Sequence, residues 1–132
     1  MTLSTAQTEQ LTAAAEELLD KAYAPYSNFQ VGAAVLTKLG NVYTGCNVEN
    51  VSYGLSICAE RNAITTAVAA EGRELEIIAV AVTNSRKIAC SPCGACRQFI
   101  QEFGKDATVI FRSDTTWETA SMQQLLPNGF SF

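Results

Sequence analysis

Histidine is absent from this 132-residue sequence. A protein without histidine has no imidazole base, and any metal site in it must use thiolates and carboxylates. Positive charge is also scarce, with nine Lys and Arg against thirteen Asp and Glu and a net charge of −4. Because nucleic-acid binding normally requires clustered positive charge, we expect no nucleic-acid partner.

Long apolar runs and targeting signals are missing as well. The longest apolar stretch, Leu75 to Val82, is too short and too interrupted to span a bilayer, and residues 1–5 lack the regions of a signal peptide. We therefore expect a cytoplasmic protein with no membrane contact. The cytoplasm keeps thiols reduced, so the five cysteines are not expected to form a disulfide framework.

The composition predicts a folded globular chain. It is 48% hydrophobic and 17% charged and has only three prolines, which excludes a disordered polypeptide. The length corresponds to one domain, and no repeat or linker divides it. We expect residues 1–132 to form a single catalytic domain.

The hydrophobic pattern predicts helices and strands in alternation. The predicted helices are Thr8–Tyr23, Ala59–Ala70, Cys93–Phe103 with Ser91 as N-cap and Pro92 at its first position, and a short one opened by a capping box at Ser121–Gln124. The predicted strands are the hairpin Val31–Leu36 and Asn41–Gly45, then Ile77–Val82 and Ala107–Phe111. A fifth strand lies near Thr115–Trp117, where the pattern does not fix its position.

This order of elements predicts the fold class. Strands alternating with helices in the second half imply parallel pairing, and the hairpin adds an antiparallel edge. We expect an α/β protein, a three-layer α/β/α sandwich with a central mixed five-stranded sheet.

Three cysteines fall at or near predicted helix starts, where free amides and the helix dipole favour the thiolate. Cys93 and Cys96 are three residues apart, so both thiols can face one point, and Cys58 would join them from a neighbouring helix. Three thiolates leave one position of a tetrahedral zinc open, which is the mark of a catalytic site. Zinc lowers the pKa of a bound water to about 7, so hydroxide forms without an imidazole base.

Glu60 is two residues beyond Cys58, close enough to reach a metal-bound water without being a ligand. It could take the proton of that water and deliver it to a ring nitrogen and a leaving amine. Hydrolytic deamination of an amidine carbon requires such a nucleophile and such a shuttle.

Cys58-Ala59-Glu60 and Pro92-Cys93-Gly94-Ala95-Cys96 resemble the signature of zinc deaminases in its three-cysteine form. Segments 24–34, 47–53 and 125–130 are similar to blocks of the small cytidine deaminases. The resemblance covers nearly the whole chain. It implies a cytidine deaminase-like fold with one zinc per chain.

The resemblance also implies roles for individual residues. Arg61 would hydrogen-bond the thiolates, which suits a site whose zinc and three thiolates carry a formal charge of −1. The residues implied in nucleoside binding are Asn47 and Glu49 at the ribose 3′-hydroxyl, Phe29 packed against the nucleoside, the backbone of Ala59 and the carbonyl of Ser91 at the pyrimidine edge, and Phe130 stacked on the base from a neighbouring subunit. The family implies a homotetramer with active sites at subunit contacts, and Tyr53 would lie at one of them.

Simpler interpretations exist for each of these residues. Cys93 and Cys96 alone could form a redox pair, and Cys46 or Cys90 could close a structural zinc site if they are not small buried hydrophobes. Glu60 could be an ordinary first-turn acid. Asn47 and Glu49 could be loop polar groups, Phe29 and Phe130 core aromatics, and Arg97 a solvated or inter-subunit arginine.

The sequence therefore predicts hydrolysis of cytidine and 2′-deoxycytidine to uridine and 2′-deoxyuridine with release of ammonia, as in pyrimidine salvage. A zinc-bound hydroxide would attack, with Glu60 as proton shuttle. The alternatives are a deaminase of a related compound such as blasticidin S, a polynucleotide deaminase, which the acidic balance disfavours, and a non-catalytic zinc or redox module. Residues 115–119, with the sole tryptophan Trp117, have no functional interpretation.

Overall fold

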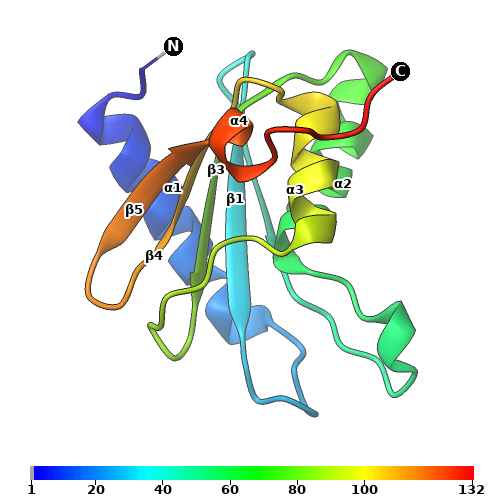
Figure 1. The fold of residues 1–132 in the computed structure, drawn as a ribbon. Helices are drawn as coiled ribbons and strands as arrows, with labels where there is room; N and C mark the ends of the chain where they lie inside the picture. Colours follow the sequence, from blue (N-terminus) through cyan, green and yellow to red (C-terminus); the bar gives the residue numbers. More distant parts are fainter. Residues whose placement is uncertain (1) are drawn as a thin grey trace.

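The computed structural model describes residues 2–132. A mixed sheet lies at its centre, with the strand order β2-β1-β3-β4-β5 (Figure 1). β3 and β4 are parallel and the other neighbours are antiparallel. The strands are β1 (Val31–Thr37), β2 (Val42–Cys46), β3 (Ile77–Asn84), β4 (Thr108–Arg112) and β5 (Trp117–Ser121).

Helices cover both faces of this sheet. α1 covers one face, whereas α2 and α3 lie side by side on the other face, to the right of the sheet in Figure 1. The helices are α1 (Thr5–Glu17), α2 (Ala59–Glu71), α3 (Gly94–Phe103) and the single turn α4 (Met122–Leu125). The predicted three-layer α/β/α sandwich with a mixed five-stranded sheet is confirmed.

The central strands are buried on both sides because each face meets a helix layer. Ala34 and Leu36 of β1 pack with Leu11 of α1 in one apolar cluster. The alternate residues Ala33 and Val35 pack with α2 and α3 in the other cluster. This is why β1 reads as a continuous apolar run rather than an alternating one.

Glycines bring the helices close to the sheet at two places. A Cβ on Gly32 would collide with the carbonyl oxygen of Ala15 in α1. A Cβ on Gly45 of β2 would collide with the backbone nitrogen of Ala63 and lie 2.7 Å from the oxygen of Ala59, both in α2. The close contact at Gly45 fixes the position of α2, whose first turn carries the candidate site.

Several element boundaries differ from the sequence predictions. α1 begins at Thr5 because Ser4 and Gln7 form a capping box, and it ends at Glu17 rather than Tyr23. Tyr23 instead donates its backbone N–H to Asn47. The N-cap of α3 is Cys93, not Ser91, because the Cys93 sulfur accepts from the N–H of Cys96.

The fifth strand lies slightly later than the sequence pattern indicated. β5 begins at Trp117 and pairs with β4 along its whole length. Trp117 packs against the cluster on the α1 side, and the Arg112 guanidinium lies 5.1 Å from its ring centroid. None of the helices within residues 2–132 has the length and apolar character that crossing a membrane requires.

Candidate functional site

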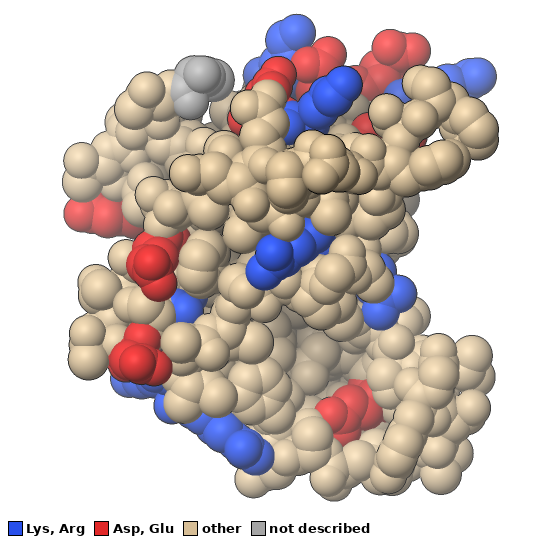
Figure 2. Space-filling view, viewed as in Figure 1, with Lys and Arg blue, Asp and Glu red and all other residues tan. Residues whose placement is uncertain are grey.

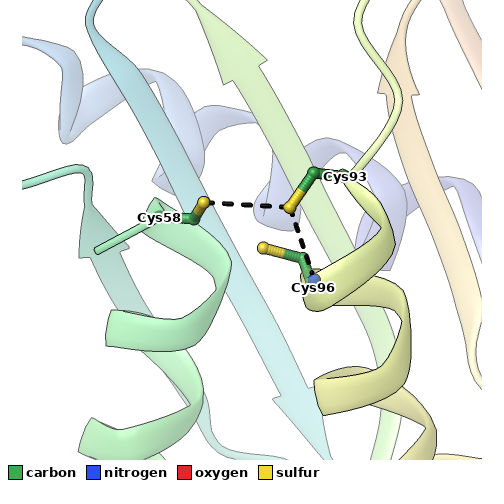
Figure 3. Close-up of side chains that lie close together, drawn as sticks. All are labelled: Cys58, Cys93 and Cys96. Atoms are coloured by element: carbon green, nitrogen blue, oxygen red, sulfur yellow. Dashed lines mark hydrogen bonds between the residues drawn. The ribbon is translucent and has the colours of Figure 1, made fainter. Parts of the chain in front are cut away.

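Three thiols from two helix starts meet at one point (Figure 3). Cys58 is the N-cap of α2 and Cys93 the N-cap of α3, while Cys96 lies in the first turn of α3. The sulfurs of Cys58 and Cys93 are 3.9 Å apart, and all three lie within 4.8 Å of one another. Zinc–sulfur bonds of 2.3 Å at tetrahedral angles place sulfurs about 3.8 Å apart. The predicted ligands are therefore brought together at a spacing that suits zinc.

The surroundings of Cys58 and Cys93 favour negative charge. Both lie at helix N-termini, and Cys93 Sγ accepts from the N–H of Cys96 at 3.4 Å. A hydrogen bond from Cys96 and then the Arg61 guanidinium hold the pKa of the Cys58 thiol well below its usual value. Because the thiolate is the form that binds metal, the site is prepared for a cation.

Arg61 gives an independent indication of the charge that this site requires. Its Nη2 donates to Cys58 Sγ at 3.6 Å and to the carbonyl oxygen of Ser56 at 3.5 Å. Its Nε is buried and has no hydrogen-bond partner among the described residues. A buried cation needs a nearby anion, and zinc with three thiolates supplies a formal charge of −1. The three thiols are a donor set that fits a bound zinc ion, and the positive Arg61 balances the charge that the zinc and the thiolates would carry together.

Glu60 stands beside the thiols in the first turn of α2 and is only 5% exposed. Burial, with the nearby Cys58 contributing, raises the pKa of its carboxyl to about 7. A carboxyl with such a pKa can both accept and release a proton near neutrality. This position and this proton affinity are those required of a proton shuttle.

A cavity of about 300 Å³ opens in front of these groups. Its volume lies at the lower end of the range for small-molecule sites. The face that contains the helix starts is hollowed in the lower half of Figure 2, with Lys and Arg scattered rather than gathered in one basic field. The predicted site residues that line the cavity are Phe29, Asn47, Glu49, Cys58, Ala59, Glu60, Ser91 and Cys93.

Asn47 and Glu49 line the cavity and also hold the loop above it. The Asn47 side chain accepts from Val31 N at 2.9 Å and donates to the carbonyl of Phe29 at 2.8 Å. Glu49 accepts from the hydroxyl of Ser27 and from the N–H groups of Tyr26 and Ser27. The Ser27 hydroxyl in particular lowers the pKa of Glu49. Asn47 and Glu49 therefore stabilise a loop, as their simpler interpretation predicted. Their side chains also line the cavity.

Two predicted substrate contacts do not reach the cavity of their own chain. Tyr53 is 74% exposed and packs edge-on against Tyr26, with ring centroids 5.9 Å apart. Phe130 is 66% exposed and lies beside α3, where Gln98 bonds both its N–H and its carbonyl. The roles assigned to both residues depend on a neighbouring subunit and stay predictions.

The structure also shows site residues that the sequence did not reveal. Cys90 lines the cavity and is exposed, so its interpretation as a buried hydrophobe is wrong. Arg97 binds within its own chain, donating to the carbonyls of Pro92 and Leu125 and to the Ser91 hydroxyl. These three hydrogen bonds give the half-buried Arg97 an intrachain role that the sequence did not indicate. The sequence around Arg97 does not predict its bond to Leu125, because the two residues are 28 positions apart.

An α/β/α sandwich with three thiols and a buried carboxyl at adjoining helix starts has the architecture of a zinc-dependent hydrolase. Residues 5–112 match the family model described as "Cytidine and deoxycytidylate deaminase zinc-binding region". The chain belongs to this deaminase family and, like it, binds zinc.

Relatives and solved structures agree with this assignment. The chain is 46% identical over 118 residues to a protein named probable cytidine deaminase from Dictyostelium discoideum, covering 89% of this chain and 80% of that one. It is 39% identical over 125 residues to the cytidine deaminase of Sporosarcina psychrophila, with 93% and 90% covered. The crystal structure of cytidine deaminase from Burkholderia pseudomallei superposes with a TM-score of 0.86 at 45% identity, covering 97% of this chain and 100% of that one.

Proposed function

We propose that this protein hydrolyses cytidine and 2′-deoxycytidine to uridine and 2′-deoxyuridine, releasing ammonia. The observation that carries the proposal is the meeting of three thiols and a buried Glu60 at adjoining helix starts, where Cys58, Cys93 and Glu60 line one cavity. The names of the relatives supply the substrate, and the cavity volume of about 300 Å³ suits a small molecule.

Each group at the floor of the cavity has one task. Cys58, Cys93 and Cys96 hold zinc, which when bound supplies an activated water as nucleophile. Arg61 balances the negative charge of the thiolates through its contact with Cys58. Glu60 carries two protons in turn: it takes the first from the attacking water and passes it to the ring nitrogen, then takes the second from the hydroxyl now on the ring carbon and passes it to the amine that departs as ammonia.

The walls of the cavity orient the nucleoside. The backbone N–H of Ala59 and the carbonyl of Ser91 bind the pyrimidine edge, and Asn47 and Glu49 bind the sugar hydroxyls. Phe29 packs against the nucleoside from the loop above. These contacts would place the carbon that bears the amine next to the three thiols and the ring nitrogen within reach of Glu60, which is how positioning lowers the barrier.

We further propose a homotetramer in which each cavity is completed by a neighbour. Val51, Tyr53 and Leu55 form an exposed apolar group beside the cavity, with 76%, 74% and 65% of their surfaces exposed. Such a group is typical of a subunit contact. Phe130 of a neighbouring subunit would stack on the base.

We also propose that residues 1–132 act as one catalytic domain. The protein would work in the cytoplasm, in pyrimidine salvage, with neither nucleic acid nor membrane as partner.

The decisive experiment follows the ultraviolet absorbance lost as cytidine becomes uridine. We expect turnover by the wild type, and at least a hundredfold loss in Glu60→Gln with zinc content unchanged, since general acid–base catalysis contributes factors of about 10² to 10⁴. Glu102→Gln, an exposed carboxyl change on α3, is the matched control. Zinc-loaded wild type that turns over neither nucleoside would contradict the proposal.

The same experiment separates the alternatives. A non-catalytic zinc or redox module has no turnover for Glu60→Gln to change, and the family assignment does not favour it. A deaminase of a related compound such as blasticidin S would ignore cytidine while depending on Glu60 with its own substrate. Retention of the cavity-lining Asn47 and Glu49 favours the nucleoside.

A further inference from the structure

The part of the cavity wall that carries Phe29 is a loop, residues 24–30, rather than a helix or strand. Asn28 in this loop has a φ of +54°, a left-handed conformation that few non-glycine residues adopt. Such a backbone keeps its shape only when its surroundings fix it. The position of the Phe29 ring therefore depends on what holds the loop.

One side of the loop is fixed by the cavity itself. Asn47 binds the carbonyl of Phe29 and the N–H of Val31, and Glu49 binds the N–H groups of Tyr26 and Ser27. These are all bonds to the inner side of the loop. The carbonyls of Ser27 and Asn28 are bonded by a different segment.

That segment is the turn after β3, and the side chain of Arg86 extends from it to the loop. Arg86 Nη2 donates to the carbonyl of Ser27 at 3.0 Å and to that of Asn28 at 3.5 Å. Its guanidinium carbon lies 5.4 Å from the centroid of the Phe29 ring, within the range of a cation–π contact. One side chain thus contacts both the backbone of the loop and the aromatic ring that the loop presents.

Arg86 is itself held from the core. The buried Asn84, 2% exposed at the end of β3, accepts from the N–H groups of Arg86 and Ile88 through its side-chain oxygen. Ser85 also donates its N–H to the carbonyl of Gln30. Within residues 2–132 no carboxylate forms an ion pair with Arg86. The contacts of its guanidinium are therefore with the backbone carbonyls and the Phe29 ring of the loop, not with a carboxylate.

We propose that Arg86 is a positioning residue for substrate binding, acting through Phe29. This inference rests on the proposed nucleoside site. Arg86 does not line the cavity, and it acts by keeping the Phe29 ring in place on a loop with a left-handed residue. Cys58, Ala59 and Glu60 lie at the start of α2, and Ser91, five residues beyond Arg86 in the same connection, is bonded separately by Arg97. Loss of Arg86 therefore weakens substrate binding and leaves the chemical step intact.

Steady-state kinetics on cytidine test this directly. We expect Arg86→Ala to raise KM about tenfold with kcat within twofold of wild type, the pattern of lost uniform binding. Arg86→Lys should be intermediate, because it keeps the charge and a donor for the carbonyls but not the planar guanidinium that lies over the Phe29 ring. Arg73→Ala, an exposed arginine beyond α2, is the matched control and should match wild type.

A double-mutant cycle with Phe29→Ala identifies the route of the effect. If Arg86 acts through Phe29, Arg86→Ala changes KM less than twofold in the Phe29→Ala background. An equal tenfold effect in both backgrounds would overturn the proposal, as would an Arg86→Ala enzyme with wild-type KM. If Arg86→Ala does not fold, the cycle is run with Arg86→Lys.

Hydrogen exchange supplies a readout that does not need activity. In Arg86→Ala the amides of residues 26–30 should exchange at least fivefold faster, while those of α2 and α3 stay unchanged. Unchanged exchange in the loop contradicts the positioning role. If wild type does not turn over cytidine but Arg86→Ala still exchanges faster in the loop, the substrate assignment is wrong. The role of Arg86 in holding the loop would then still be supported.

Discussion

Two arginines near neighbouring helix starts show how position decides the task of a residue. Arg61 of α2 contacts the sulfur of Cys58 and buries a nitrogen with no partner among the described residues. Arg97 of α3 donates hydrogen bonds to the carbonyls of Pro92 and Leu125 and to the Ser91 hydroxyl. The first responds to the charge of the thiolates, and the second fixes the loop that presents Ser91 to the cavity.

Exchanging these arginines for glutamine should separate the two tasks. We expect Arg61→Gln to lower zinc affinity about 10- to 100-fold, the usual effect of losing a group that bonds a metal ligand. Arg97→Gln should keep its zinc affinity but lose about 1–3 kcal/mol of stability, because buried acceptors lose their donors. Competition with a chromogenic chelator and thermal unfolding measure the two quantities. Equal zinc affinity in both variants would contradict this division.

At the same scale, the sequence predicted those site residues whose relation is local. Cys93 and Cys96 are one helical turn apart and Cys58 and Glu60 are two residues apart, so their spacing alone places them together. Cys90 in the cavity wall and the bonding of Arg97 depend on segments distant in sequence, and no local pattern reports them. Arg86 likewise reaches Ser27 across 59 positions.

Among the elements, α2 matters most, because it carries Cys58 and Glu60 and packs closely on β2. The closest approach is at Gly45, where a side chain would meet the backbone of α2 itself. Backbone cannot move aside as a flexible side chain can. The position of the metal ligand Cys58 therefore depends on the absence of one methyl group from the neighbouring strand.

Gly45→Ala tests this dependence. The added methyl should displace α2, lower stability by about 1–3 kcal/mol as overpacking does, and weaken zinc binding because Cys58 moves away from Cys93. Ala70→Ser, an exposed change near the C-terminal end of α2, is the control. Differential scanning calorimetry with metal analysis reports both effects. A Gly45→Ala protein with the melting temperature and zinc content of wild type would show that α2 is not held in this way.

The elements themselves were largely predictable because each has its own local signal. Short apolar runs predicted the strands, and helical spacing with helix stops such as Gly72 predicted the helices. Their order along the chain predicted the three layers. The end of α1 was less predictable, because Tyr23 leaves the helix to bond Asn47, which is remote in sequence. β5 lacks glycine or proline signals at its start and is defined by pairing with β4.

At the scale of the whole molecule, the cavity of one chain is lined without Phe130, which lies exposed beside α3. The proposed tetramer would bring this ring to a neighbour's cavity. A single chain would then hold the chemistry of one site and part of the binding surface of another. Activity would be a property of the assembly.

Complementation between two inactive variants tests this arrangement. Glu60→Gln has an intact Phe130 but no shuttle, and Phe130→Ala has a shuttle but no ring. Co-expressed, they should form mixed oligomers in which some sites combine both wild-type groups, with activity well above that of either variant alone. Mixtures of separately purified, non-exchanging oligomers are the control. Activity no greater than the sum of the parents would place Phe130 outside the neighbour's site.

The three sulfur ligands also constrain the order in which this chain can mature. Cys93 and Cys96 are neighbours, but Cys58 is 35 positions from Cys93, and β3 lies between them. In the unfolded chain only the adjacent pair can chelate locally, and closing the longer loop carries an entropic cost that β3 and the packing of α2 have to offset. We therefore expect full metal uptake to follow the assembly of the sheet and of the layer formed by α2 and α3. Zinc acquisition would then report completed folding, with the ion as a late cross-link between these two helices.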